Sequence, residues 1–253
     1  MGKIVAIGGG VLSEGETDSI DNFILELSGK ESPSVLFVPT ASYDSPEYSE
    51  TFAEVYQKLG CSVDTLNLLG RSPIDGELKE KILSPDIIYV GGGNTLKMMR
   101  RWRRLGVDGL IRQAWESGAV LCGVSAGAIC WFEWGHSDSM SFYDEDDWKY
   151  VRVAGMGLIK GLACPHYDSD TKGVPRRADF HNMMLKHSDP GIAIDNRCAL
   201  AVLDDGYRVI SATETAGAYT LTNERGSVVE EPINQSQDWE PIETLYLRRE
   251  HER

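Results

Sequence analysis

A serine flanked by small residues stands out in the segment CGVSAGAIC, which runs from Cys122 to Cys130. Ser125 lies in the pattern G-V-S-A-G, after the apolar run 119–124 and before the helix-like segment AGAICWF. A G-x-S-x-G pattern at a strand-to-helix turn presents a serine hydroxyl at the edge of a sheet, because glycines keep side chains out of the sharp turn. A purely structural turn would need the same small neighbours, so a nucleophile and a turn serine are both open here.

A nucleophilic serine needs a base, and the chain contains five histidines. His166 follows the apolar run LIKGLAC, which predicts a strand end and hence a position at the same sheet edge as Ser125. The other histidines lie in less suitable places: a loop for His136, a polar helix-like stretch for His181 and His187, and the polar C-terminal tail for His251. We therefore prefer His166 as the base.

An acid must hold the imidazole in place, and spacing alone does not select one. The candidates near the serine and the histidine are Glu133, Asp138, Asp168 and the cluster 144–147. All of them stay open on the residues alone.

Triple glycines occur twice, at 8–10 and at 91–93, each after a predicted strand. Neither run has the third glycine of a dinucleotide-binding GxGxxG pattern, and the chain has no GxxxxGK[ST] phosphate-binding loop, so nucleotide binding is disfavoured. The glycines of GGGNT would let backbone N–H groups approach a developing negative charge, as in an oxyanion hole. A tight turn would need the same glycines, and both interpretations remain open.

Apolar runs of strand length alternate with stretches of helical periodicity. The runs cover 3–7, 34–38, 62–68, 86–90 and 119–124, and the helical stretches cover 20–27, 46–59 after Ser45 as N-cap, and 95–117 with a break near Gly106. Continuous apolar strands separated by helices predict an α/β three-layer sandwich with a mostly parallel sheet. Closely spaced strands within 191–212 predict a hairpin or an antiparallel extension. We expect one domain over residues 1–253, with a frayed tail from about 245.

The bulk composition excludes several classes of function. A net charge of −14 and a pI near 4.8 disfavour nucleic-acid binding, and no apolar run is long enough to cross a bilayer. The cysteines number five and form no CxxC pair, which predicts reduced, mostly buried thiols in a cytoplasmic protein. Because no histidine forms a close cluster with cysteine, we expect neither a metal nor another cofactor.

Three sequence blocks together resemble the dipeptidase E (aspartyl dipeptidase) and cyanophycinase family of serine peptidases. The blocks are IIYVGGGNT (87–95), CGVSAGA (122–128) and CPHYDSDTKGVPRR (164–177). The resemblance covers most of the chain, from residue 34 to about residue 210. It implies a class I glutamine-amidotransferase-like sandwich, with serine replacing the usual cysteine nucleophile.

The resemblance also implies roles for the matching positions. Ser125 corresponds to the nucleophile, His166 to the base and Asp138 to the third acid. The implied oxyanion and substrate contacts fall on Gly92, Gly93 and Ala126 for the oxyanion hole, and on Asn94 and Arg176 for the substrate. An arginine at position 176 would read an acidic substrate side chain through bidentate pairing.

Our leading hypothesis is a serine exopeptidase that hydrolyses short peptides, including dipeptides with an N-terminal acidic residue, through an acyl-enzyme. The segment FYDEDDWKYV (142–151) lies between nucleophile and histidine, and its acidity disfavours acidic substrates at a site it lines or covers. The alternatives are an amidase or esterase, and a binding protein on the same fold that keeps the elbow as structure. Small peptides are the expected partners, and a homodimer is among the assemblies considered.

Overall fold

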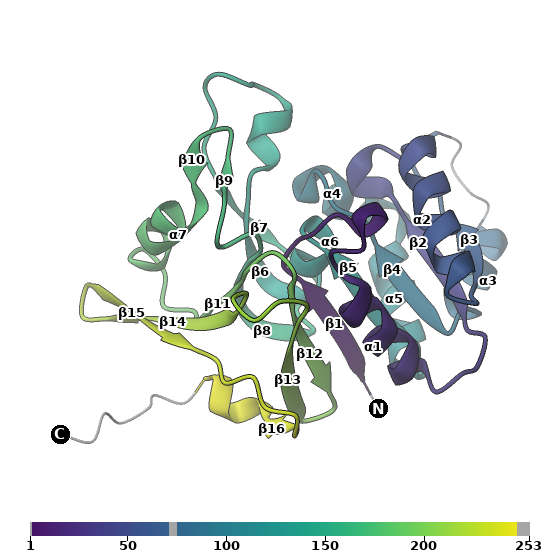
Figure 1. Cartoon of the computed structure of the whole chain (residues 1–253). Coiled ribbons are helices and arrows are strands. Elements are labelled where there is room, and N and C mark those ends of the chain that lie inside the picture. The colour runs from purple at the N-terminus through teal and green to yellow at the C-terminus, as the bar shows by residue number, and fades with distance from the viewer. Residues whose placement is uncertain (1, 71–74, 247–253) are drawn as a thin grey trace.

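The computed structural model describes residues 2–70 and 75–246, and its central element is an eight-stranded mixed sheet (Figure 1). Five of its strands run parallel, in the spatial order β3 (Ser62–Thr65), β2 (Ser34–Val38), β4 (Ile87–Val90), β5 (Val120–Val124) and β1 (Lys3–Ile7). The sheet continues antiparallel through β12 (Cys198–Leu203), β13 (Gly206–Ser211) and β16 (Glu240–Pro241). The predicted parallel sheet is confirmed, and so is an antiparallel extension over 198–211; residues 191–194, predicted together with it, form a strand of another sheet instead.

Helices cover both faces of this sheet, because alternate side chains of its buried strands point to opposite sides. On one face, α1 (Asp18–Ser28) and α2 (Pro46–Lys58) pack on residues such as Val5 and Phe37. The other face carries α3 (Asp75–Leu83), α4 (Thr95–Leu105), α5 (Val107–Glu116) and the short α6 (Ala126–Ile129). The three layers match the predicted fold class.

Local signals set two helix boundaries as predicted. The side chain of Ser45 accepts a hydrogen bond from the Tyr48 N–H and caps α2, with Pro46 at the first helical position. Gly106 has a φ of 69° and separates α4 from α5, because glycine adopts the left-handed conformation at little cost.

A second sheet of six strands was not predicted. Its order is β15 (Ser227–Pro232), β14 (Ala218–Glu224), β11 (Gly191–Ile194), β8 (Ile159–Cys164), β6 (Phe132–Ser137) and β7 (Val151–Ala154). A small hairpin of β9 (Asp170–Thr171) and β10 (Val174–Pro175) leads into α7 (Arg176–Met184), and both lie beside this sheet in Figure 1. The short 3₁₀ segments complete the described elements: η1 (Leu12–Glu14), η2 (Thr40–Ser42), η3 (Ser139–Phe142) and η4 (Ile242–Leu245).

Two local predictions in this region were wrong. The helix predicted over AGAICWF ends at Ile129, and Phe132 already begins β6. His136, predicted to lie in a loop, is fully buried within β6. The reason is tertiary: the His136 ring stacks on Tyr150 and packs against Phe180, so this polar residue is enclosed by segments distant in the sequence.

All five cysteines are free and buried, as the sequence predicted. Burial raises the pKa of each thiol, so these groups are held protonated. Among the described residues, no helix is long and apolar enough to cross a membrane. The tail predicted to fray from about 245 falls largely on residues 247–253, which lie outside the described part of the chain.

An isolated buried carboxyl group lies between α1 and α2. Asp21 is 1% exposed and accepts hydrogen bonds from the Tyr56 hydroxyl at 2.6 Å and the Thr17 hydroxyl at 2.7 Å. Burial raises the pKa of Asp21 from 3.8 to about 6, more than these two bonds lower it.

This carboxyl group makes stability depend on pH. Because the folded pKa of Asp21 exceeds the unfolded one, the folded state binds more protons between about pH 4 and pH 6, and stability falls as pH rises through that window. The difference is worth about 3 kcal/mol, to order of magnitude. We expect urea unfolding of wild type to lose about this much relative to Asp21→Asn between pH 4 and pH 7. Glu26→Gln, an exposed change on the same helix, should keep the wild-type dependence; parallel curves for wild type and Asp21→Asn would contradict the prediction.

Candidate active site

Ser125 forms a strained elbow at the carboxyl end of β5. Its φ of 57° and ψ of −109° lie outside the regions that non-glycine residues favour, and α6 begins at the next residue. Gly127 permits this turn, because a β-carbon there would lie only 2.1 Å from the Val90 carbonyl oxygen. The same applies to Gly123, where a β-carbon would lie 2.6 Å from that oxygen. Ser125 thus lies in a sharp turn between β5 and α6 that requires small residues on both sides.

The second glycine run lies directly against this serine. A β-carbon on Gly92 would lie 3.4 Å from Ser125 Cβ and 3.9 Å from its Oγ. Gly93 has a φ of 131° and packs so closely on the Ala41 carbonyl that no side chain would fit. Ala126 is the first residue of α6, where a backbone N–H has no acceptor within the helix. The structure thus brings Gly92, Gly93 and Ala126 around Ser125.

His166 is held by its main chain and by its ring. Its backbone N–H donates to the Gly8 carbonyl at 3.0 Å, and its Nδ1 lies 2.6 Å from Oδ1 of Asn196. Because an amide oxygen only accepts, Nδ1 carries the proton and Nε2 is left with a lone pair. Asn196 is fixed in turn by Asp168, whose Oδ1 accepts from Asn196 Nδ2 at 2.8 Å and from its backbone N–H at 2.9 Å.

The end of β1 joins the two halves of the site. The N–H of Ser125 donates to the Ile7 carbonyl and that of His166 to the Gly8 carbonyl, both at 3.0 Å. The serine and the histidine are therefore anchored on consecutive residues of one chain segment. Gly9 follows, and a β-carbon there would lie 2.0 Å from Asn196 Oδ1 and 2.4 Å from His166 Nδ1. The first glycine run thus makes room for the histidine and its partner.

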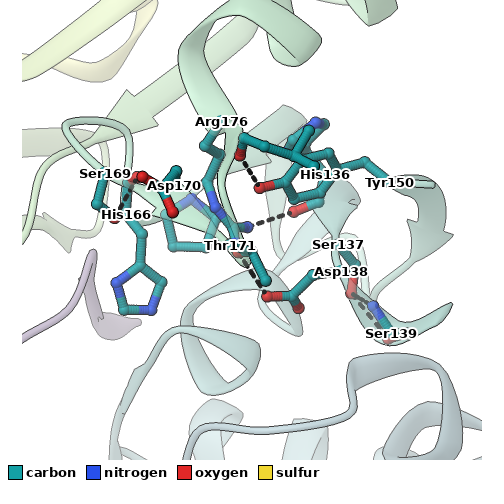
Figure 2. A network of polar contacts seen from close by, with 12 residues as sticks. His136, Ser137, Asp138, Ser139, Tyr150, His166, Ser169, Asp170, Thr171 and Arg176 are labelled. Atoms are coloured by element: carbon teal, nitrogen blue, oxygen red, sulfur yellow. Dashed lines mark hydrogen bonds and ion pairs between the residues drawn. The ribbon is translucent and has the colours of Figure 1, made fainter. Parts of the chain in front are cut away.

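Asp138, the acid predicted to orient the histidine, bonds elsewhere. Its Oδ2 accepts from Arg176 at 2.7 Å and from the Thr171 hydroxyl at 3.1 Å. Figure 2 shows this carboxylate beside Thr171, while the His166 ring is set apart from the network. The predicted hydrogen bond to His166 is made by Asn196 instead.

Arg176, predicted to read an acidic substrate side chain, is 2% exposed. Besides Asp138, its guanidinium donates to the Thr171 hydroxyl at 2.8 Å and lies 4.9 Å from the centre of the Tyr150 ring. Such a buried, paired guanidinium leaves no open edge for a substrate carboxylate.

Asn94, also predicted to bind substrate, is completely buried. Its Oδ1 accepts from the Lys97 N–H at 2.9 Å, and its Nδ2 donates to the Ser139 carbonyl at 3.3 Å. It caps α4 and ties that helix to the segment before the acidic loop, which is a structural role.

The acidic, aromatic segment 142–151 packs on the β9–β10 hairpin. Its Tyr150 donates to the Val174 carbonyl at 3.0 Å and stacks on the buried His136 ring with centroids 4.2 Å apart. Glu145 pairs with Lys172 of the hairpin at 3.5 Å. The segment therefore holds the Arg176 network in place from outside.

The electrostatic surroundings favour a neutral His166. Burial is the main factor that lowers its pKa below 6.5, and the nearby Arg176 cation lowers it further. The bond to Asn196 and the charges of Asp138 and Asp168 act in the opposite direction and are weaker. At neutral pH the ring is thus unprotonated at Nε2 and can accept a proton.

Sequence reasoning missed Asn196. The signal was present, since Asn196 follows a strand, β11, and strand ends gather at one edge of a sheet. It was overlooked because only carboxylates were considered as partners of the histidine. Among residues 2–70 and 75–246, no group of three or more His, Cys, Asp and Glu residues is arranged to hold a metal ion.

Comparison with known proteins agrees with this geometry. Residues 4–210 match the sequence profile of peptidase family S51. The chain is 36% identical over 236 residues to the uncharacterized peptidase YgaJ of Bacillus subtilis (strain 168), covering 92% of this chain and 97% of that protein. A shorter match, 33% over 105 residues, joins 41% of this chain to 42% of peptidase E of Salmonella arizonae.

A solved structure has the same fold. The crystal structure of a peptidase from an acI-B1 actinobacterium superposes with a TM-score of 0.71 at 20% identity, covering 95% of this chain and 97% of that chain. The resemblance carried by the three sequence blocks is thereby confirmed: the chain belongs to peptidase family S51.

Proposed function

We propose that the protein is a serine peptidase that cleaves short peptides through an acyl-enzyme formed on Ser125. The observation that carries the proposal is the joint anchoring of Ser125 and His166 on the consecutive carbonyls of Ile7 and Gly8. A turn serine kept only for structure would not require a histidine with a free Nε2 on the adjacent residue of the same segment. Membership of a peptidase family supports the same activity.

The proposed reaction follows from the positions of these groups. Ser125 Oγ attacks the scissile carbonyl while His166 Nε2 takes its proton, and the oxyanion that forms is stabilised by the backbone N–H groups of Ala126 and Gly93, since the Gly92 N–H bonds the Tyr48 hydroxyl. The protonated His166 then gives the proton to the leaving amine. A water molecule, activated by the same nitrogen, hydrolyses the ester and restores Ser125.

Asn196 takes the orienting role in this proposal. It fixes the tautomer of His166 as an amide does in Cys-His-Asn peptidases, and Asp168 fixes Asn196. Asp138 influences the base through its charge and through its pairing with Arg176.

The cytoplasm is the proposed working compartment, since five free, buried thiols suit a reducing environment. Amidase or esterase chemistry would use the same groups, and a binding protein would use none of them. Assays on panels of peptide, amide and ester substrates distinguish a peptidase from an amidase or esterase. Covalent labelling of the serine distinguishes all of these enzymes from a binding protein.

Replacing the nucleophile should abolish catalysis. We expect Ser125→Ala to lower kcat on a dipeptide panel by at least about 10³-fold and to prevent labelling by a fluorophosphonate. Ser117→Ala is the matched control, because this exposed serine precedes β5 just as Ser125 follows it. Hydrolysis that persists in Ser125→Ala would refute the proposed function.

Removing the amide that orients His166 should weaken catalysis but not abolish it, because Ser125 and His166 are both still present. Asn196→Ala is expected to lower kcat/KM by about 100-fold, the usual effect of a misplaced catalytic group, with fluorophosphonate labelling slowed in parallel. Asp138→Asn should cost less activity once folding is verified by thermal melting. A folded Asp138→Asn variant with the larger loss would return the orienting role to Asp138.

The pH profile should report the lowered pKa of His166. Since the base works in its neutral form, the acidic limb of kcat/KM should have its midpoint below the ordinary histidine value of 6.5. Arg176→Gln removes a nearby cation, so the limb should move to higher pH, whereas Arg176→Lys keeps the charge and should leave it in place. An acidic limb that stays fixed in Arg176→Gln would show that burial alone sets this pKa.

A further inference from the structure

A cavity of about 380 Å³ reaches Val124, the residue that precedes Ser125 in the chain. It lies between the segment after β1 and the N-terminal turn of α2. Gly10 also lines the cavity and follows Gly9, which lies against the His166 ring. A substrate residue next to the scissile bond can therefore enter it.

One wall of the cavity is continuous with the glycine loop at Ser125. Tyr48 lines the cavity, and a β-carbon on Gly91 would lie 2.9 Å from its ring. A backbone hydrogen bond also links Gly92 to the Tyr48 hydroxyl. With Tyr89, Tyr48 gives the cavity aromatic surface suited to the methylene groups of a side chain.

The charge in and behind this cavity is negative. Glu47 is the one charged side chain that lines it among the described residues, with the hydroxyl groups of Ser13, Thr17 and Thr51 nearby. Behind Thr17 lies the carboxyl group of Asp21, which accepts the Thr17 hydroxyl. No lysine or arginine of the described residues lines the cavity.

One cationic side chain beside the cavity wall is already paired. The Arg197 side chain lies against Gly10, a lining residue, and binds Glu16 through Nε at 3.0 Å. An acidic substrate side chain would thus meet Glu47 without a compensating cation.

The N-terminus of α2 opposes this charge only in part. A helix N-terminus carries about half a positive charge, and Glu47 adds a full negative one. Moreover, Pro46 has no N–H, and the Tyr48 N–H already donates to the Ser45 side chain. The remaining field in the cavity favours a cation.

We propose that this cavity is the specificity site for a cationic group of the peptide, an ammonium or guanidinium ion that pairs with Glu47 while its methylene groups pack on Tyr48 and Tyr89. The proposal rests on the proposed peptidase function. It assigns to this chain a preference for basic over acidic residues next to the scissile bond.

The test compares dipeptides that differ in one charge. Wild type, Glu47→Gln and the control Glu54→Gln are assayed on pairs carrying lysine, its uncharged isostere norleucine, or aspartate at either position. We expect wild type to prefer lysine over norleucine by about tenfold in kcat/KM, as a charge-assisted hydrogen bond would give. This ratio should fall to near one in Glu47→Gln and persist in Glu54→Gln, which removes an exposed charge two turns along α2. Aspartate should be the poorest of the three.

Selective acetylation identifies the bound cation. If ε-acetylation of the lysyl dipeptides removes the dependence on Glu47, the side-chain ammonium occupies the cavity, as proposed; if only α-acetylation removes it, the terminal ammonium does, and the proposed preference for basic residues is wrong. Hydrolysis that needs Ser125 but shows the same lysine to norleucine ratio in wild type and Glu47→Gln would overturn the cavity proposal and leave the peptidase proposal standing.

Binding provides a readout that does not need turnover. Calorimetry on Ser125→Ala should show lysyl dipeptide binding about tenfold tighter than on Ser125→Ala with Glu47→Gln. If no peptide is hydrolysed by wild type, the peptidase proposal fails, and this comparison still decides the cavity: equal affinities refute it.

Discussion

The carboxyl end of β1 is the constraint on which the rest of the site depends. Its last carbonyl groups accept the main-chain N–H groups of Ser125 and His166, and the bare backbone of Gly9 leaves the space that the histidine ring and Asn196 occupy. Three segments, after β5, β8 and β11, therefore converge on one short stretch of chain. Any side chain at Gly9 would displace the base from its partner, so the glycine has a geometric role that needs no bound ligand to explain it.

Two residues of these converging segments have strained backbone conformations, which the surrounding structure maintains. Ser125 and His166 both have positive φ, at 57° and 52°, a conformation that costs a non-glycine residue of order 1–3 kcal/mol. The elbow is held by α6, whose Gly127 packs on the Val90 carbonyl, and by the bonds to β1. Because the main chains of both strained residues are held by consecutive carbonyl groups at the end of β1, their positions depend on the same short segment.

The sequence correctly predicted those strands and helix ends that depend on neighbouring residues in the chain. Strands such as 34–38 were placed correctly because they are buried on both faces and so form unbroken apolar runs, and Ser45 and Gly106 act through their own backbone neighbourhood. The strand β6 escaped prediction because it mixes polar with apolar residues, and its His136 is buried only through contacts with Tyr150 and Phe180 from distant segments. The partners of His166 and Asp138 likewise lie 30 and 38 residues away, in contacts that spacing does not reveal.

The buried ion pair of Arg176 and Asp138 determines which effect the Arg176 charge can have at the site. A guanidinium that is 2% exposed acts on its surroundings through its field, and its described effect falls on the base, whose pKa it lowers. Among the described residues, the charged side chain that lines the open cavity is a carboxylate, Glu47. An arginine at the expected place in the motif therefore does not by itself establish a preference for acidic substrates. The motif determines where the guanidinium lies. The residue that pairs with the guanidinium determines whether it can bind a substrate carboxylate or instead shifts the pKa of the histidine.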